Sequence, residues 1–105
     1  MSAGHMVEVR ISDAARIDLE DIRTVGIARF GQDAAAHHLR EIGQAFALLA
    51  DHPSAGQPRP EFSQDIRAIA RRPHRILYTV IDGAVLIVRI IRQARDVSIA
   101  LRDDR

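Results

Sequence analysis

The sequence predicts a single α+β domain with the element order βααβββ, in which a helical hairpin packs on a twisted antiparallel sheet. Three observations support this class: an apolar alternation near the start of the chain, two helical apolar stripes, and three strand patterns after a proline-rich loop. The 105 residues fit one domain, and 47% hydrophobic residues are enough to bury a core.

The chain opens with a segment that resembles a cloning remnant. Gly-His-Met within residues 1–6 is typical of such a remnant, so we expect the domain to span residues 7–101, with a frayed tail at 102–105. Apolar and charged residues alternate over residues 7–11, which predicts a half-buried strand that pairs at one side of the sheet.

Two amphipathic helices follow this strand. Ser12 and Asp13 offer capping oxygens for the first helix, which is expected to end near Phe30. Its apolar positions are Ala15, Leu19, Ile22 and Gly26. Gly31 can adopt a positive φ and Asp33 can cap the next helix, so a tight turn is expected between the two.

The second helix carries the longest apolar stripe in the chain. Its members are Ala35, Leu39, Ile42, Phe46 and Leu49. Asp51-His52-Pro53 ends the helix, and Pro53, Gly56, Pro58 and Pro60 predict a stiff extended loop, because proline restricts φ.

The second half of the chain changes to a strand pattern. Three antiparallel strands are expected, over residues 66–71, 75–81 and 84–92. Asp82-Gly83 predicts a type I′ turn between the last two. The last strand is nearly all apolar and is expected to be central and covered on both faces, followed by a short strand or helical turn at 97–101. Tyr78 is interpreted as a core residue with its hydroxyl at the rim.

The composition excludes several kinds of site. Cys is absent, which excludes disulfides, thiolate nucleophiles and Cys-ligated metals, and fits a reducing cytoplasm. All fifteen basic residues are Arg, so chemistry that needs a deprotonated Lys is excluded, although a GC-rich genome would produce the same bias. No apolar run approaches the roughly 20 residues of a membrane span. We expect a soluble cytoplasmic protein without metal or cofactor.

The net charge of +1 conceals a basic second half. Residues 1–58 carry five Arg against eight acidic residues, whereas residues 59–95 carry eight Arg against three. The strand arginines are expected to form an electropositive surface for phosphates, carboxylates or an acidic peptide, although a solvated polar face would have the same pattern. The candidate partner-binding residues are Arg59, Arg67, Arg71, Arg75, Arg89, Arg92 and Arg95.

Acidic and histidine clusters in the helices carry weaker signals. Asp18, Glu20 and Asp21 spread around the helix axis near its start, where they favour the helix dipole, so we expect solvated charges and not a metal site. His37 and His38 point about 100° apart, which predicts a surface pair and not a ligand pair.

The successive motifs of nearly the whole chain form a recognisable order. After the capped first helix they are Leu49-Ala50-Asp51-His52-Pro53, Gly56, Arg59-Pro60-Glu61-Phe62, Asp65-Ile66-Arg67, Arg75-Ile76-Leu77-Tyr78, and Val88-Arg89-Ile90-Ile91-Arg92 through Arg95-Asp96. This set resembles the ParE family of the RelE/ParE toxin superfamily, whose fold would then be the one outlined above.

The resemblance implies the toxin of a bacterial type II toxin–antitoxin pair, held in a hetero-oligomeric complex by a ParD-like antitoxin. The best-known ParE toxins inhibit DNA gyrase by trapping it on cleaved DNA, and they are not nucleases themselves. We therefore expect a binding protein with no catalytic residues, no membrane partner and no sequence-specific DNA binding of its own. A detoxified member that only forms a repressor complex with its antitoxin is a further alternative.

The RelE branch of the superfamily, whose members cleave messenger RNA on the ribosome, is the leading alternative. A gap-free comparison places two of its phosphate-stabilising arginines on Arg75 and Arg95. Its lysines fall near Ile66 and Ala68 and its terminal tyrosine on Leu101, so the proton-transfer residues are missing, and Arg is a poor base. A histidine frequent in the last strand of ParE proteins is also replaced, by Arg92.

The antitoxin is expected to supply a disordered carboxy-terminal segment that folds on the toxin. It would bury apolar groups beside the helical hairpin and the sheet. Its acidic residues would contact Arg67, Arg71 or Arg89.

Overall fold

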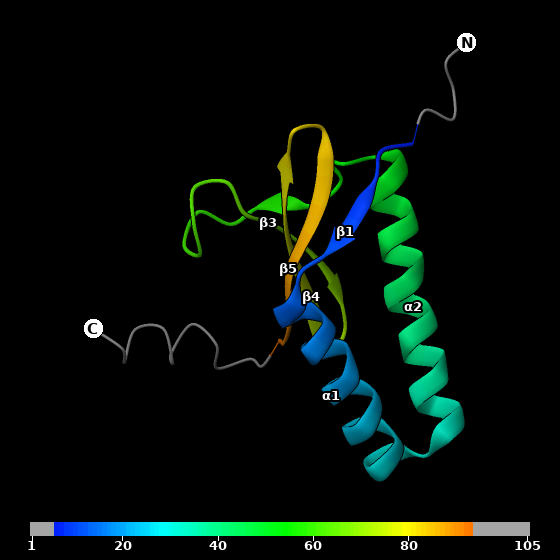
Figure 1. Cartoon of the computed structure of the whole chain (residues 1–105). Coiled ribbons are helices and arrows are strands. Elements are labelled where there is room, and N and C mark those ends of the chain that lie inside the picture. The colour runs from blue at the N-terminus through cyan, green and yellow to red at the C-terminus, as the bar shows by residue number, and fades with distance from the viewer. Residues whose placement is uncertain (1–5, 94–105) are drawn as a thin grey trace.

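The computed structural model describes residues 6–93 and places seven elements along them (Figure 1). They are β1 (Val9–Ile11), α1 (Asp13–Phe30), α2 (Gln32–Asp51), β2 (Gln57–Pro58), β3 (Arg67–Arg71), β4 (His74–Ile81) and β5 (Ala84–Arg92). The predicted α+β class is confirmed, with both helices ahead of the main strands. The expectations for residues 1–5, for Arg95 and for residues 97–105 lie outside the described residues.

The sheet has five strands in the order β1-β5-β4-β3-β2, and it is mixed. β1 runs parallel to β5, with Val9 opposite Val85 and Ile11 opposite Ile87, whereas the other three pairs are antiparallel. The prediction of a wholly antiparallel sheet is therefore wrong at one pair. The alternation of apolar residues is the same in parallel and antiparallel strands, so it cannot predict the direction of β1 relative to β5.

β2 is a short edge strand where the sequence predicted only a loop. Gln57 pairs with Ala68 and Pro58 with Arg67, and the N–H of Arg59 then donates to the carbonyl of Ile66 at 2.8 Å. The prolines favoured a loop, but an edge strand tolerates a proline because one side of the strand needs no donor. The loop after α2 is consequently held against β3.

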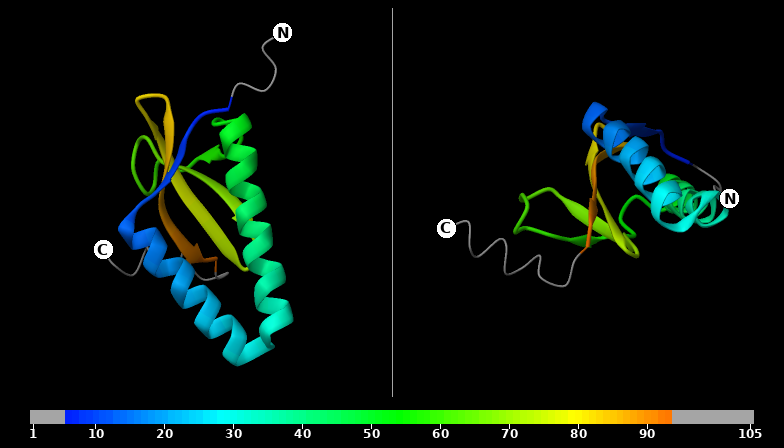
Figure 2. Two further views of the ribbon diagram at one scale, coloured as in Figure 1. Left: turned by 45° about the vertical axis from the view of Figure 1, so that its right-hand side comes forward. Right: turned by 90° about the horizontal axis from the view of Figure 1, so that it is seen from below.

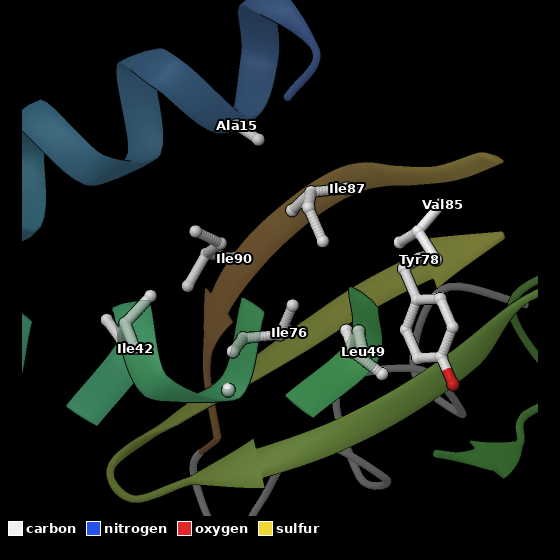
Figure 3. Close-up of a cluster of buried hydrophobic side chains, with 9 residues drawn as sticks. Ala15, Ile42, Leu49, Ile76, Tyr78, Val85, Ile87 and Ile90 are labelled. Atoms are coloured by element: carbon white, nitrogen blue, oxygen red, sulfur yellow. The ribbon is translucent and has the colours of Figure 1, made fainter. Parts of the chain in front are cut away.

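Both helices cover the same face of the sheet (Figure 2). The core between them consists of Ala15, Ile42, Ala45, Leu49, Ile76, Tyr78, Val85, Ile87 and Ile90 (Figure 3). β5 has a strand on each side, as predicted, but the predicted cover on both faces is wrong. Leu86, Val88 and Ile91 are only half-buried. One residue links the two helices, so the hairpin cannot place one helix on each face.

The turns confirm most of the predicted capping. The hydroxyl of Ser12 accepts from the N–H of Ala15 at 3.0 Å and donates to the carbonyl of Val88 at 2.9 Å. Gly31, with φ 92°, ends α1 and also caps α2. Asp33 makes no capping bond, contrary to the prediction, because α2 begins one residue before it.

The predicted type I′ turn between β4 and β5 is present. Asp82 has φ 53° and Gly83 has φ 77°, and a type I′ turn needs positive φ at both central residues. At the other end of the molecule, the turn between the helices extends beyond the strands (Figure 1). The distal part of the hairpin therefore has no sheet beneath it.

Candidate functional site

Three of the seven candidate arginines meet in one depression, which we call the basic hollow. Arg59, Arg71 and Arg75 line it around a volume of about 330 Å³. The other lining residues are Ala55, Gly56, Gln57, Ala68, Ile69, Ala70 and Gln93. Because Ile76 and Tyr78 belong to the core under the helices, strand alternation directs Arg75 to the opposite face of the sheet. The basic hollow thus lies away from the helical layer.

Two further candidate arginines are engaged in bonds within the fold. Nη1 of Arg67 donates to the carbonyls of Gly56 at 2.7 Å and Ser54 at 3.3 Å. Arg89 forms a bidentate ion pair with Asp18, through Nε at 2.8 Å and Nη2 at 3.0 Å. These two guanidinium groups stabilise the domain before any partner arrives.

A larger depression, which we call the apolar groove, lies between the helical hairpin and one end of β4 and β5. It encloses about 420 Å³. Its titratable or charged lining is Asp18, Asp21, His38, Arg72, His74 and Arg92. The rest of the lining is Ile22, Val25, Gly26, Phe30, Ala34, Ala35, Pro73 and Ile90. Phe30 is 65% exposed and Val25 is 47% exposed. Large apolar side chains exposed together indicate a binding surface for a partner.

A histidine pair joins α2 to β4 within the apolar groove. Nε2 of His38 and Nδ1 of His74 are 2.9 Å apart. Burial, followed by the nearby His38 and Arg92, lowers the pKa of His74 from 6.5 to about 4, against the opposing effect of Asp18. The predicted surface pair is wrong for His38, whose side chain is 17% exposed, and right for His37, at 67%.

Asp18 is a structural carboxylate that ties α1 to β5. Besides Arg89, it accepts the backbone N–H of Ile90 at 2.8 Å. Burial disfavours its charge, but the hydrogen bonds from Arg89 and Ile90 prevail and lower the pKa of Asp18 below its usual value. The prediction of a solvated charge is wrong here, since its side chain is 11% exposed.

Tyr78 is fully buried, as predicted for a core residue, and its hydroxyl is held by the loop after α2. It accepts from the N–H of Gly56 at 2.8 Å and donates to the carbonyl of Pro53 at 2.7 Å. Burial raises the pKa of Tyr78, with the Gly56 bond and Arg67 acting against it. This hydroxyl positions one wall of the basic hollow, because Gly56 lines it.

Sequence reasoning missed the roles of Asp18 and His38, although one signal was present. Asp18 follows Ala15 by three residues, and His38 follows Ala35 by three, so both lie on the buried helical stripes. Their partners, in β4 and β5, are far along the chain. No local pattern predicts those contacts.

The two depressions differ in the chemistry that they can support. The basic hollow presents guanidinium donors, which bind anions but cannot accept a proton near neutral pH. Within residues 6–93, no group of three or more His, Cys, Asp or Glu side chains is arranged to hold a metal ion. No helix in that part of the chain is both long and apolar enough to cross a membrane.

Sequence comparison finds related proteins over most of the chain. The family model of the ParE toxin of the parDE type II toxin–antitoxin system matches residues 9–97. Toxin ParE1 of Caulobacter vibrioides is 34% identical over 89 residues, which are 85% of this chain and 92% of that protein. Toxin ParE1 of Mycobacterium tuberculosis is 32% identical over 88 residues, covering 83% of this chain and 90% of that protein.

Structural comparison finds the same fold in toxin–antitoxin systems. A chain of the chromosomal ParDE system of P. aeruginosa superposes with a TM-score of 0.73 at 22% identity, covering 87% of this chain and 100% of that chain. A chain of the RelBE2 toxin–antitoxin complex of Mycobacterium tuberculosis superposes with a TM-score of 0.61 at 23% identity, and the match covers 85% of this chain and 93% of that chain.

Proposed function

Because this chain belongs to the ParE toxin family of type II toxin–antitoxin systems, we propose that it arrests bacterial growth by inhibiting DNA gyrase. A ParD-like antitoxin neutralises it in this proposal, in a hetero-oligomeric complex in the cytoplasm. Inhibition operates through binding of the toxin surface to gyrase and not through a reaction catalysed by the toxin.

The lining of the basic hollow is the observation that carries this proposal. Cleavage of an RNA backbone needs a base for the 2′-hydroxyl and a proton donor for the leaving oxygen. The described residues around Arg75 supply arginines, glutamines and apolar groups, and these side-chain types do not serve as general acids or bases near neutral pH. The histidine pair lies in the apolar groove, on the helical side of the sheet. Binding is therefore favoured over RNA cleavage.

Supercoiling and cleavage assays with purified gyrase, ATP and folded toxin test the target. We expect loss of supercoiling or accumulation of linear DNA, reversed by the antitoxin. If the protein arrests growth in cells without affecting gyrase, the target is wrong. Cut messenger ends in a primer-extension assay would then favour the RelE-like endonuclease, with Arg75 as a phosphate stabiliser.

The apolar groove is the surface that we assign to the antitoxin. An amphipathic segment that folds on binding would cover Val25 and Phe30, which are otherwise exposed to solvent. Arg92 is the candidate arginine in this lining, so we expect an acidic antitoxin residue to contact it. Arg67 and Arg71 remain candidates for contacts outside the groove, whereas Arg89 would have to exchange Asp18 for an antitoxin carboxylate.

Phe30→Ser and Ile17→Ser form a matched pair for testing this surface. Both residues are on α1 and are similarly exposed, at 65% and 59%, but only Phe30 lines the groove. We expect Phe30→Ser to weaken antitoxin binding by about tenfold or more, as for a central apolar contact, and Ile17→Ser to have little effect. Equal losses in calorimetric titrations would contradict the assignment.

Charge reversal tests the electrostatic part separately. Arg92→Glu is expected to weaken antitoxin binding and to reduce its dependence on salt. Unchanged affinity would remove Arg92 from the interface without affecting the apolar assignment.

A further inference from the structure

We propose that the apolar groove also binds a second copy of this chain, in a two-fold symmetric dimer that the toxin forms when it is free of its antitoxin. The inference goes beyond the proposed function, because dimerisation concerns the toxin alone and holds whichever protein is its target. One groove can serve both partners, since the antitoxin and a second toxin copy would occupy it at different times.

The first argument is the apolar surface that the single chain leaves uncovered. Phe30 is 65% exposed and Val25 is 47% exposed, and both line the groove. They lie in the part of α1 nearer to the turn between the helices, which extends beyond the sheet (Figure 1). Large apolar side chains exposed together favour association. A toxin acts when it is free of its antitoxin, so the antitoxin cannot cover this surface in the active state.

The second argument is that one surface offers both an exposed aromatic side chain and a space that can receive one. Phe30 is the last residue of α1 and lies in the lining of the groove. The groove encloses about 420 Å³, which is within the range of pockets that receive small ligands and is enough for an aromatic ring. In a two-fold contact the same patch of each copy meets the other, so each copy needs both features. Phe30 of each copy would enter the groove of the other.

The third argument is the division of charge between the two walls of the groove. Both carboxylates in the lining, Asp18 and Asp21, come from α1. Both arginines in the lining, Arg72 and Arg92, come from the end of the sheet, in the turn before β4 and at the end of β5. Asp18 is paired with Arg89, whereas Asp21 and the two lining arginines form no ion pair within residues 6–93. The groove therefore has an acidic helical wall and a basic sheet wall that do not neutralise each other by direct contact.

A two-fold axis at the groove would use these opposite charges twice. Asp21 of each copy would contact Arg92 of the other copy, because an isologous interface repeats every contact in reverse. Opposite charges that meet across an interface steer association and fix the orientation of the partners. A partner with charge of one sign would complement only one of the walls, so the arrangement favours a second copy of this chain.

Analytical ultracentrifugation of the full chain, folded and free of antitoxin, tests the proposal over a range of protein concentrations. We expect a reversible equilibrium between monomer and dimer. Phe30→Ser should raise the dissociation constant of the dimer by about tenfold or more, as for a central aromatic contact. Ile17→Ser is the matched control on α1 and should leave the constant nearly unchanged, because Ile17 is 59% exposed but lies outside the groove. A wild-type protein that stays monomeric at all concentrations would overturn the dimer, as would equal losses in the two variants.

An exchange of charges between copies tests the reciprocal contact. We expect Asp21→Arg and Arg92→Asp each to weaken dimerisation by about tenfold or more, because each brings like charges together in the interface. An equimolar mixture of the two variants should recover association, since their heterodimer contains two pairs of opposite charge. A chain with both substitutions should recover it for the same reason.

Glu20→Arg is the matched control for the charge exchange. Glu20 precedes Asp21 on α1 and is exposed, but it does not line the groove. The Glu20→Arg variant should dimerise as the wild-type protein does, and circular dichroism should show that every variant is folded. A mixture of Asp21→Arg and Arg92→Asp that associates no better than either variant alone would overturn the proposed dimer.

Discussion

At the scale of single residues, the hydroxyl of Tyr78 illustrates how a buried polar atom organises a surface. It satisfies a backbone donor at Gly56 and a backbone acceptor at Pro53, and both lie in the loop that follows α2. Removing the hydroxyl would leave the buried N–H of Gly56 and the part-buried carbonyl of Pro53 without this partner, which costs more than the bond itself contributes. One oxygen atom therefore holds two points of the loop, in addition to the bonds that Arg67 donates to the carbonyls of Ser54 and Gly56.

The hydroxyl of Tyr78 should lose its proton at an abnormally high pH, and this titration can be observed directly. It is the only Tyr in the chain, so tyrosinate absorbance reports on it alone. Its pKa is raised above 10.0 by burial, and the midpoint should lie above that value in the folded protein. The folded state holds the proton more tightly, so the contribution of Tyr78 to the unfolding free energy should be constant below about pH 10 and decrease above it. A midpoint at or below 10.0 would contradict this environment.

Tyr78→Phe provides the corresponding stability test. We expect it to lower the unfolding free energy by about 1–3 kcal/mol, since two backbone groups lose their partner. Urea denaturation followed by circular dichroism measures the change. A loss well below that range would mean that water reaches the loop and replaces the hydroxyl.

At the scale of elements, the loop after α2 approaches the sheet so closely that only glycine fits at position 56, where the loop contacts the sheet. A Cβ at Gly56 would lie 2.6 Å from Cε1 of Tyr78 and 2.8 Å from the carbonyl oxygen of Ala68. The backbone oxygen cannot move aside as a flexible side chain would. In the sequence, Gly56 indicated only a turn between prolines, because the strand that it contacts is distant along the chain.

Alanine substitutions at two glycines should therefore change the free energy of unfolding in opposite directions. Gly56→Ala should destabilise the fold by about 1–3 kcal/mol through overpacking. Gly43→Ala, on the exposed side of α2 with nothing within 4 Å, should stabilise it by about 0.5–1 kcal/mol, since alanine favours the helix. Chemical denaturation of the two variants measures both effects, and a neutral Gly56→Ala would show that the loop can retreat.

The elements themselves were predictable to different degrees. α1 follows from its capping residues, both helices follow from regular apolar spacing, and β5 follows from a continuous apolar run that begins directly after a type I′ turn. β1 has three residues where five were expected, and β2 was not expected at all. Short edge strands depend on pairing with a neighbour more than on their own pattern, which explains these misses.

At the scale of the whole molecule, the contact between His38 and His74 couples the helical layer to the sheet. The pKa of His74 is about 4 in the folded protein, whereas the ordinary pKa of a histidine, taken for the unfolded chain, is 6.5. The folded state therefore binds the His74 proton less tightly than the unfolded chain does. Between about pH 4 and 6.5 the unfolded state binds more protons than the folded state, so the unfolding free energy decreases as the pH is lowered through this range.

The expected result is a fall in unfolding free energy from pH 6.5 toward pH 4, and most of that slope should disappear in His74→Gln. His37→Gln is the matched control, because His37 is on the same helix as His38 but its side chain is 67% exposed. Denaturation curves at several pH values measure the slopes. An unchanged slope in His74→Gln would assign the acid sensitivity to another group.

Local sequence specifies the α+β class, the extents of the two helices, the central position of β5 and its turn with β4. These features depend on periodicity, capping and permitted φ values, which act between near neighbours in the chain. The tertiary structure alone decides the direction of β1, the division of the candidate arginines between the basic hollow and the apolar groove, and the pairings of Asp18 and His38. Each of these depends on which distant residues meet when the helical hairpin packs on one face of the sheet, and side-chain type at a single position does not encode its partner.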